Sequence, residues 1–361
     1  MSEPVLWRGP VGRLAISSFR SKRSCLPTFT RYISACGVLA LLLGGAPLYA
    51  QSVDPEIRYS IESSRAASHL LLDITRAGER LVAAGDRGHI LYSDDEGASW
   101  VQAKVPTRQL LTAIQFVDDQ HGWAVGHDAL ILVTTDGGQT WARQYENRES
   151  EVPLLDVWFE NAQHGLAVGA YGMLLETHDG GRNWEDIADR LDNEDGYHLN
   201  AITEIKGSGL FVVGEMGGMH RSADMGQTWE AVESPYQGSF FGVIGGETDV
   251  VLAFGLRGHM FRSADFGDSW QAVDLRDNGH ALEAGLADGN LLDDGRMVVV
   301  GHAGAVLSSE DQGRSFKLFS RPDRRSLSGV VANAAGNLVL VGQSGVRVVS
   351  PVGENLPVEQ Q

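Results

Sequence analysis

An eight-residue box recurs six times in this chain and constrains the fold more than any other feature. Its second and third copies read Thr-Thr-Asp-Gly-Gly-Gln-Thr-Trp (134–141) and Thr-His-Asp-Gly-Gly-Arg-Asn-Trp (177–184). The key Asp of each copy follows the previous one by 41 to 46 residues, at Asp95, Asp136, Asp179, Asp224, Asp265 and Asp311. A period of this length is typical of a repeat architecture.

A second element, a short apolar run that ends in Gly-x-x-Gly, precedes each box. Full copies of the glycine pair lie at 85–88, 169–172, 214–217, 255–258, 301–304 and 342–345, and Gly126 begins a partial copy. Together the two elements indicate seven units between about residue 68 and residue 350. Apolar runs of four to seven residues, punctuated by Gly and Asp, predict four short strands in each unit.

Four-stranded units repeated seven times predict an all-β fold, a seven-bladed β-propeller in which each box is the turn between the third and fourth strands. An open solenoid is the alternative. The last unit carries no box and no fourth strand. Ile57–Ile61 alternates apolar and polar residues. We therefore predict that the N-terminal segment 51–67 supplies the missing strand and closes the ring, with 68–350 as the propeller and 351–361 as a C-terminal tail.

Residues 1–50 have a different composition from the rest. Six Lys and Arg side chains face a single acidic one, an apolar run follows through Leu43, and Ala50 ends the segment after Gly44, Gly45 and Pro47. This pattern predicts a signal peptide and a secreted or periplasmic protein, with a retained membrane anchor as the alternative. Cys36 precedes the apolar run instead of following it, which argues against a lipidation site.

Charge and cysteine content exclude several classes of function. The chain has 29 Lys and Arg against 47 Asp and Glu, a net charge of -18, which argues against nucleic acid as a partner because phosphate binding needs an excess of basic side chains. Both cysteines, Cys25 and Cys36, lie in the leader. A disulfide framework or a cysteine-based zinc site is therefore excluded for the propeller.

The box itself predicts architecture and not catalysis. Its Asp can accept hydrogen bonds from backbone N–H groups of its own turn, the Gly two residues later allows a left-handed backbone, and its Trp can wedge between neighbouring sheets. An enzyme has one active site, whereas this device occurs six times. We expect no catalytic residues and no cofactor.

The alternatives are a sialidase-like glycoside hydrolase or a carbohydrate-binding propeller. Against the hydrolase, no unique carboxylate pair and no Arg-Ile-Pro stretch is present. The eleven His residues show no metal-ligand spacing. His121 and His164 occupy equivalent places before the second strand, which favours a structural role over a metal site.

The pattern Ala-Val-Gly-x-x-Gly, an aliphatic strand and Thr-x-Asp-Gly-Gly-x-Thr-Trp, clearest at 124–141 and 167–184, resembles the photosystem II stability/assembly factor family. The resemblance implies a non-enzymatic, seven-bladed propeller on the lumenal or periplasmic side. It also implies a membrane or envelope protein as partner, which in photosynthetic members is the D1 reaction-centre subunit. We expect a monomer.

The resemblance further implies a patch of arginines on one face. In a propeller, the connections from strand two to three and from strand four to the next blade share the face opposite the boxes. Loops on a rigid scaffold often bind partners, and Arg suits carboxylates. We predict partner-binding residues there, with 321–325 as the densest cluster; solvated loop charge is the alternative. The predicted residues are Arg87, Arg257, Arg276, Arg321, Arg324 and Arg325, and Arg108, Arg143 and Arg148 fall in loops of the same kind.

Overall fold

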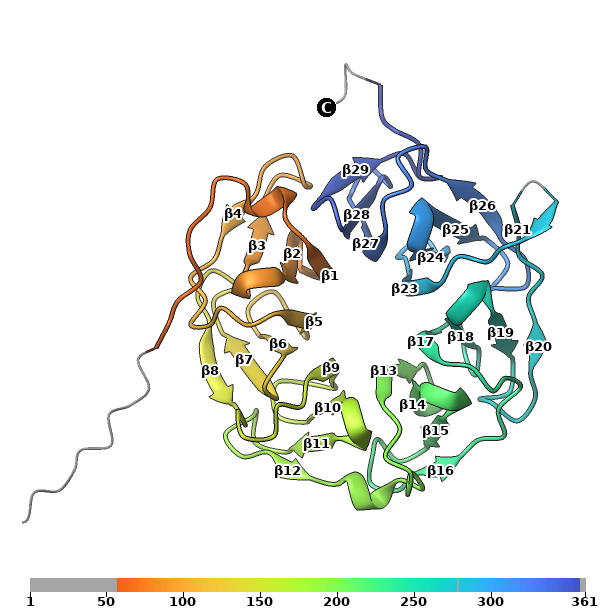
Figure 1. The fold of residues 1–361 in the computed structure, drawn as a ribbon, viewed down its shortest axis with the longest axis horizontal. Helices are drawn as coiled ribbons and strands as arrows, with labels where there is room; N and C mark the ends of the chain where they lie inside the picture. The colour runs from red at the N-terminus through yellow and green to blue at the C-terminus, as the bar shows by residue number, and fades with distance from the viewer. Residues whose placement is uncertain (1–56, 278, 358–361) are drawn as a thin grey trace, which may run out of the picture. The chain divides into compact units, whose positions relative to one another are not determined.

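The computed structural model describes residues 57–277 and 279–357, so the predicted signal peptide at 1–50 lies outside the described residues. Seven antiparallel sheets stand around a central channel like the blades of a wheel (Figure 1). Six of them have four strands, and the last has three within the described residues. The predicted seven-bladed all-β propeller is confirmed.

The strands follow one another from the centre of the wheel to its rim in each blade, in sequence order. Blades 1 to 4 consist of β1 (Leu71–Ala77), β2 (Arg80–Gly85), β3 (Ile90–Ser93), β4 (Val101–Gln102); β5 (Leu111–Phe116), β6 (Gly122–Gly126), β7 (Leu130–Thr134), β8 (Ala142–Tyr145); β9 (Leu154–Phe159), β10 (Gly165–Gly169), β11 (Leu174–Thr177), β12 (Glu185–Asp186); β13 (Leu199–Ile205), β14 (Gly209–Gly214), β15 (Met219–Ser222) and β16 (Glu230–Ala231). Blades 5 to 7 consist of β17 (Phe240–Gly245), β18 (Val251–Gly255), β19 (Met260–Ser263), β20 (Gln271–Ala272); β23 (Leu286–Leu291), β24 (Met297–Gly301), β25 (Ala305–Ser309), β26 (Lys317–Ser320); β27 (Leu327–Ala332), β28 (Leu338–Gly342) and β29 (Arg347–Val349). A separate hairpin, β21 (Arg276–Asp277) and β22 (His280–Ala281), connects blades 5 and 6.

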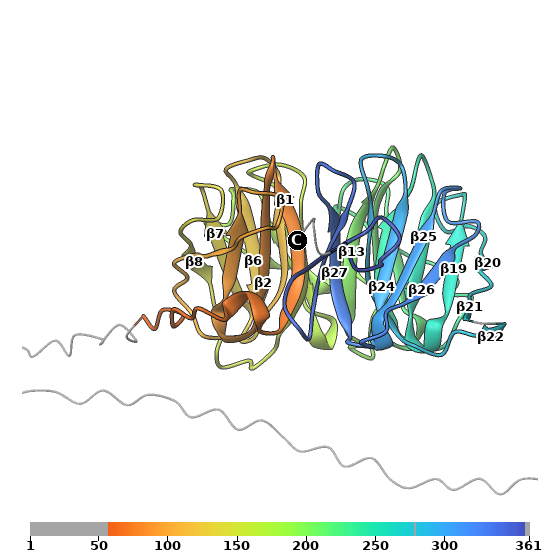
Figure 2. The ribbon, with the colours of Figure 1, turned by 90° about the horizontal axis from the view of Figure 1, so that it is seen from above.

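The helical segments are single 3-10 turns of three residues. They are η1 (Ala66–Ser68), η2 (Asp86–Gly88), η3 (Ala170–Gly172), η4 (Ala188–Arg190), η5 (Glu215–Gly217), η6 (Leu256–Gly258) and η7 (His302–Gly304). Within residues 57–277 and 279–357, no helix has the length and apolar character needed to cross a bilayer. Figure 2 shows that the strands run between two faces of the wheel that carry the connections.

Apolar packing between neighbouring blades holds the wheel together. There are seven buried clusters, and each joins two adjacent sheets; the first, for example, contains Val82 of blade 1 with Leu132 of blade 2. The box Trp packs into the cluster shared with the preceding blade, as Trp141 does against residues of blade 1. The box aromatics therefore lie between neighbouring sheets.

The ring closes through the cluster between blades 7 and 1, and the prediction for Ile57–Ile61 is wrong. These residues form no strand, and the Ser60 N–H donates to Val105 O, in the connection that leaves blade 1, at 2.9 Å. Closure comes instead from Leu71 and Ile74 packed against Val339 and Val341. An alternating pattern predicts an extended segment, but it does not say which sheet edge the segment meets.

The C-terminal segment contacts the outer strand of the last blade as far as Asn355. Asn355 forms an isolated antiparallel bridge with Val349 at the end of β29. The Ser350 N–H donates to Glu354 O at 2.8 Å, which closes the turn between them. Residues 350–355 therefore fold back along β29.

Candidate functional site

The box turns use their Asp carboxylates to hold their own backbone. In every copy Oδ1 of the Asp accepts the N–H four residues on, as from Asn183 to Asp179 at 2.9 Å. The side-chain and backbone hydrogen bonds from Asn183 lower the pKa of Asp179 to about 2. These carboxylates are ionised and already bonded, which suits a fastener better than a general acid or base.

A side chain of the preceding blade binds each box and locks neighbouring blades in register. The Gln144 side-chain amide of blade 2 donates to Gly180 O in the third box at 2.7 Å. Arg80 donates to Gly137 O in the second box at 2.9 Å, and Arg221 to Phe266 O in the fifth at 3.1 Å. These side-chain donors on the box face therefore bond to the backbone of the next blade and stabilise the fold.

The opposite face carries the Gly-x-x-Gly turns and the connections between blades, and five of the six predicted arginines are exposed there. Arg87 and Arg257 occupy the left-handed tips of their turns, with φ of 56° and 57°. The Arg276 guanidinium lies 2.9 Å from the Asp274 carboxylate, and Arg87 lies 3.6 Å from Asp86. Arg87, Arg257 and Arg276 lie in separate connections of the propeller, in η2, η6 and the β21–β22 hairpin.

Arg321 is a correction to the sequence prediction, because its side chain is buried inside the protein. Only 3% of the residue is exposed. Its guanidinium donates to Gly353 O at 2.7 Å and to the Asn355 side chain at 2.9 Å. Arg321 therefore anchors the C-terminal return. Its neighbours Arg324 and Arg325 remain exposed, and Arg324 lines a pocket of about 540 Å³ with His280, His302 and Glu283.

A different set of arginines meets in one pocket on this face, between blades 1 and 2. We call it the arginine pocket, and it encloses about 530 Å³ lined by Arg58, Thr107, Arg108, Gln109, Asp128, Arg143 and Arg148. Its four guanidinium groups come from three parts of the chain: the N-terminal segment, the connection from blade 1 to blade 2, and the end of blade 2.

Backbone and side-chain contacts position these arginines. Arg108 donates to Tyr59 O at 2.8 Å, which ties the N-terminal segment to the pocket. Arg143 donates to Pro106 O at 2.7 Å and to the Glu146 carboxylate at 3.0 Å. Because the scaffold holds these groups in place, a ligand meets them with little loss of side-chain entropy.

The pocket is cationic although the protein is acidic. Glu146 pairs with Arg143 and, at 2.9 Å, with Arg148. Asp128 accepts a hydrogen bond from Gln109. Two carboxylates thus face four guanidinium groups. Arg58 has no ion pair among the described residues. The site is suited to an anionic group, above all a carboxylate that can take two parallel N–H donors from one Arg.

Sequence reasoning places Arg108, Arg143 and Arg148 on the right face but misses Arg58. The alternating pattern around Arg58 predicts a ring-closing strand in the last blade. The structure instead places Arg58 in the pocket between blades 1 and 2. Nothing in the residues around it indicates that Tyr59 and Ser60 bond to blade 1 and its outgoing connection.

The central channel presents three acidic side chains from the innermost strands. Asp73, Asp156 and Asp288 line a space of about 600 Å³ together with Lys206. The Ile114 N–H donates to Asp73 at 2.7 Å and the Ile202 N–H to Asp156 at 2.9 Å, so each Asp reaches the next blade. Burial raises the pKa of Asp73 and of Asp156 to about 7 and raises that of Asp288 as well. These residues therefore connect neighbouring blades through hydrogen bonds.

Comparison with known families gives a match over more than half of the chain. A family model described as "Photosynthesis system II assembly factor YCF48" matches residues 96–152 and 146–281. The matched segments begin in the first box and end after the fifth, so they cover the region in which the repeat is most regular.

Two curated relatives match shorter segments. The photosystem II stability/assembly factor HCF136 of Cyanidioschyzon merolae is 36% identical over 110 residues, 28% of this chain and 24% of that protein. The photosystem II assembly protein Ycf48 of Synechococcus sp. (strain JA-2-3B'a(2-13)) is 36% identical over 140 residues, 38% of this chain and 41% of that protein. The chain thus spans less than half the length of each.

Solved structures share the fold at low sequence identity. One described as "YCF48 bound to D1 peptide" has a TM-score of 0.61 and 18% identity, and the match covers 77% of this chain and 92% of that one. A streptogramin B lyase has a TM-score of 0.65 and 11% identity, covering 81% and 97%. The fold therefore accommodates both binding proteins and enzymes, as expected for a common scaffold.

Proposed function

Because the chain belongs to the family described as photosystem II assembly factor YCF48, we propose that it is a non-enzymatic assembly factor that binds a membrane protein client. The observation that carries this proposal is the arginine pocket, a cationic site with four guanidinium groups on an acidic protein. The client contributes a carboxylate, from an acidic side chain or a chain terminus, to these guanidinium groups.

Two features support binding rather than catalysis. The repeated carboxylates are bonded within their own turns, and the curated relatives are called assembly factors. The alternative, a sialidase-like hydrolase or a carbohydrate-binding propeller, is separated by a panel of chromogenic glycosides, on which we expect no turnover. Sustained turnover that a single carboxylate substitution abolishes would replace the assembly-factor proposal.

The client meets the protein outside the cytoplasm in this proposal. Its support is the basic, apolar and small-residue pattern of residues 1–50, which is typical of an exported protein. The D1 subunit is the first candidate client, because a YCF48 protein with this fold is described as bound to a D1 peptide. Another membrane protein takes its place if the host has no photosystem II.

The test is binding of a labelled D1 peptide with a free carboxyl terminus, followed by fluorescence anisotropy. The double substitution Arg108→Glu with Arg148→Glu reverses two exposed charges in the pocket and should weaken binding by about tenfold or more, or about 1.4 kcal/mol. The matched control is Arg314→Glu, an exposed arginine in the sixth box on the other face, which should bind like the unmodified protein.

Two further results complete the test. Binding should weaken with rising salt, since exposed charges contribute through screened interactions. If the D1 peptide does not bind, affinity capture from membrane extracts should recover a specific protein that the double variant fails to retain. Equal retention by the double variant and the control would reject the pocket as the binding site.

A further inference from the structure

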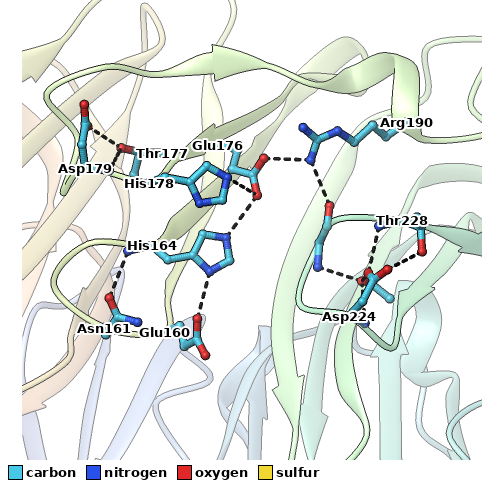
Figure 3. A network of polar contacts seen from close by, with 12 residues as sticks. Glu160, Asn161, His164, Glu176, Thr177, His178, Asp179, Arg190, Asp224 and Thr228 are labelled. Atoms are coloured by element: carbon cyan, nitrogen blue, oxygen red, sulfur yellow. Dashed lines mark hydrogen bonds and ion pairs between the residues drawn. The ribbon is translucent and has the colours of Figure 1, made fainter.

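Blade 3 contains a group of three metal-ligand side chains at the box end of its sheet. The Nε2 atoms of His164 and His178 lie 3.1 and 3.3 Å from the same Glu176 carboxylate oxygen, and the ligand atoms of all three residues lie within 4.8 Å of one another. Figure 3 shows the two rings one above the other beside Glu176. We propose that His164, Glu176 and His178 bind a divalent metal ion of the zinc type.

The sheet itself brings these residues together. Glu176 lies in β11, and His178 follows the end of that strand at the start of the third box turn. Gly165 pairs with Thr177 at the end of the ladder between β10 and β11, and the His164 and His178 rings stack just beyond that pair. Paired strands therefore hold Glu176, and the two histidines lie in the short turns directly beside it.

Outer contacts prepare two of the three ligands. The Glu160 carboxylate lies 3.0 Å from Nδ1 of His164, and Arg190 donates to the second oxygen of Glu176 at 2.8 Å. A histidine that gives its Nδ1–H to a carboxylate turns the lone pair of Nε2 toward the metal, the usual arrangement in zinc sites. In His164 the Nε2 atom faces a buried carboxylate oxygen, so either a proton, which makes the imidazole cationic, or a metal ion lies between the two atoms.

The donor set matches the chemistry of zinc. Two imidazoles and one carboxylate form an established ligand set that leaves a fourth position open to water. Ligands bound at about 2.1 Å in tetrahedral geometry stand about 3.4 Å apart, close to the observed 3.1 and 3.3 Å. Only 2% of the Glu176 side chain is exposed, and Arg190 already pairs with one of its oxygens, which leaves the other oxygen to the two histidines.

One ring must turn when the metal binds. The His164 and His178 rings are stacked with centroids 4.8 Å apart and planes within 7°. An imidazole nitrogen presents its lone pair in the ring plane, so two parallel rings cannot both address one ion. The His178 side chain is 66% exposed, and within the part of the chain that the structure describes its only polar contact is with Glu176, so the ring can rotate.

Other blades show that the architecture does not require this group. Blade 2 has the same turn, with His121 2.9 Å from the Asp118 carboxylate, but Val133 and Thr135 stand where blade 3 has Glu176 and His178. A role confined to positioning Arg190, which also reaches Gly226 O at 3.2 Å in the next box, would not need two histidines. Gln144 makes the equivalent contact one blade earlier without either.

The test is calorimetric titration of the full-length protein, stripped with chelator, with zinc chloride near neutral pH. We expect a saturable site of one ion per chain that His178→Gln weakens by at least about tenfold. His178→Gln alters an exposed side chain and should leave the fold intact, which circular dichroism verifies. Glu160→Gln should weaken binding by about 10- to 100-fold, the range for outer-shell partners of metal ligands. His121→Gln is the matched control and should bind zinc normally.

Cobalt supplies a second readout, because its visible absorption reports the ligand geometry. The unmodified protein and His121→Gln should develop the same cobalt spectrum, and His178→Gln should not. The proposal is overturned if no saturable zinc binding is found, or if His178→Gln binds zinc and cobalt as the unmodified protein does. The latter result would assign the metal to another part of the chain.

Discussion

Blades 2 and 3 share their turns and much of their apolar packing, but they carry different polar side chains at the box end and on the innermost strand. Both have a His before the second strand and a box with two consecutive glycines. Blade 3 adds Glu176 and His178 at the box end and Asp156 on the innermost strand, where blade 2 has Val133, Thr135 and Ala113. The shared residues specify the wheel, and the differences are where blade-specific chemistry arises.

The largest expected effect tests the shared part. Trp141 is 6% exposed, and its Nε1 donates to Gly138 O at 3.0 Å. Trp141→Ala should lower the free energy of unfolding by about 3–5 kcal/mol, as for other buried aromatic truncations. Trp184 is the same box residue in blade 3 but is half-buried, so Trp184→Ala should cost less.

Urea unfolding followed by circular dichroism measures both variants. An unchanged unfolding midpoint for Trp141→Ala would contradict the role of the box aromatic as an inter-blade wedge. If Trp184→Ala proved the more damaging, the two interfaces would not be equivalent and the shared sequence would be a poor guide to stability.

The second prediction concerns Asp156, which blade 2 lacks. Burial raises its pKa from 3.8 to about 7, so the folded protein holds the proton to a higher pH than the unfolded chain does. Its contribution to stability is therefore present at low pH and is lost as the pH rises from about 4 to about 7. Because the side chain is only half-buried and faces the channel, we expect a loss of about 2 kcal/mol, less than the full shift implies.

The measurement is the free energy of unfolding across that pH range for the unmodified protein and Asp156→Asn. The unmodified protein should lose more stability with rising pH than the variant. Asp189→Asn, an exposed carboxylate in the same blade, is the control and should follow the unmodified protein. Parallel curves for Asp156→Asn and the unmodified protein would show that Asp156 does not titrate in this range.

The third prediction addresses the box Asp, which the two blades share. Asp136 accepts the Thr140 N–H at 2.9 Å and hydroxyl hydrogen bonds from Thr134 and Thr140. Asp136→Ala should cost about 1–2 kcal/mol, and Asp179→Ala should destabilise the protein in the same direction. Asp119→Ala, at an exposed position nearby, should have little effect in thermal melts. If Asp136→Ala leaves the stability unchanged, the box Asp does not stabilise its turn.

The contrast between the blades also explains what can be predicted from sequence. The boxes and glycine turns recur along the chain, so the number of blades and the positions of their turns can be predicted from local patterns. One such pattern is the left-handed glycine of each box, for example Gly138 with φ of 85°. Sequence reasoning misplaces Arg58 and Arg321 because each depends on where a terminal segment packs, which no local pattern encodes. The departure of Glu176 and His178 from blade 2 is a visible signal, but only the register of the strands shows that both meet His164.

The smallest expected effect tries to convert one blade into the other. Val133→Glu with Thr135→His gives blade 2 the two ligands that it lacks, beside His121, whose Nδ1 already lies 2.9 Å from Asp118. Val133 is half-buried and Thr135 exposed, so we expect the fold to tolerate both changes. The double variant should take up a second zinc ion, more weakly than blade 3, because the blade 2 counterpart of Arg190 is the uncharged Gln144, which holds a carboxylate less strongly. Each single substitution alone should add no second ion to the titration. If the double variant also binds only one, the spacing of the ligands is insufficient, and the contacts of Glu160 and Arg190 are what make blade 3 different.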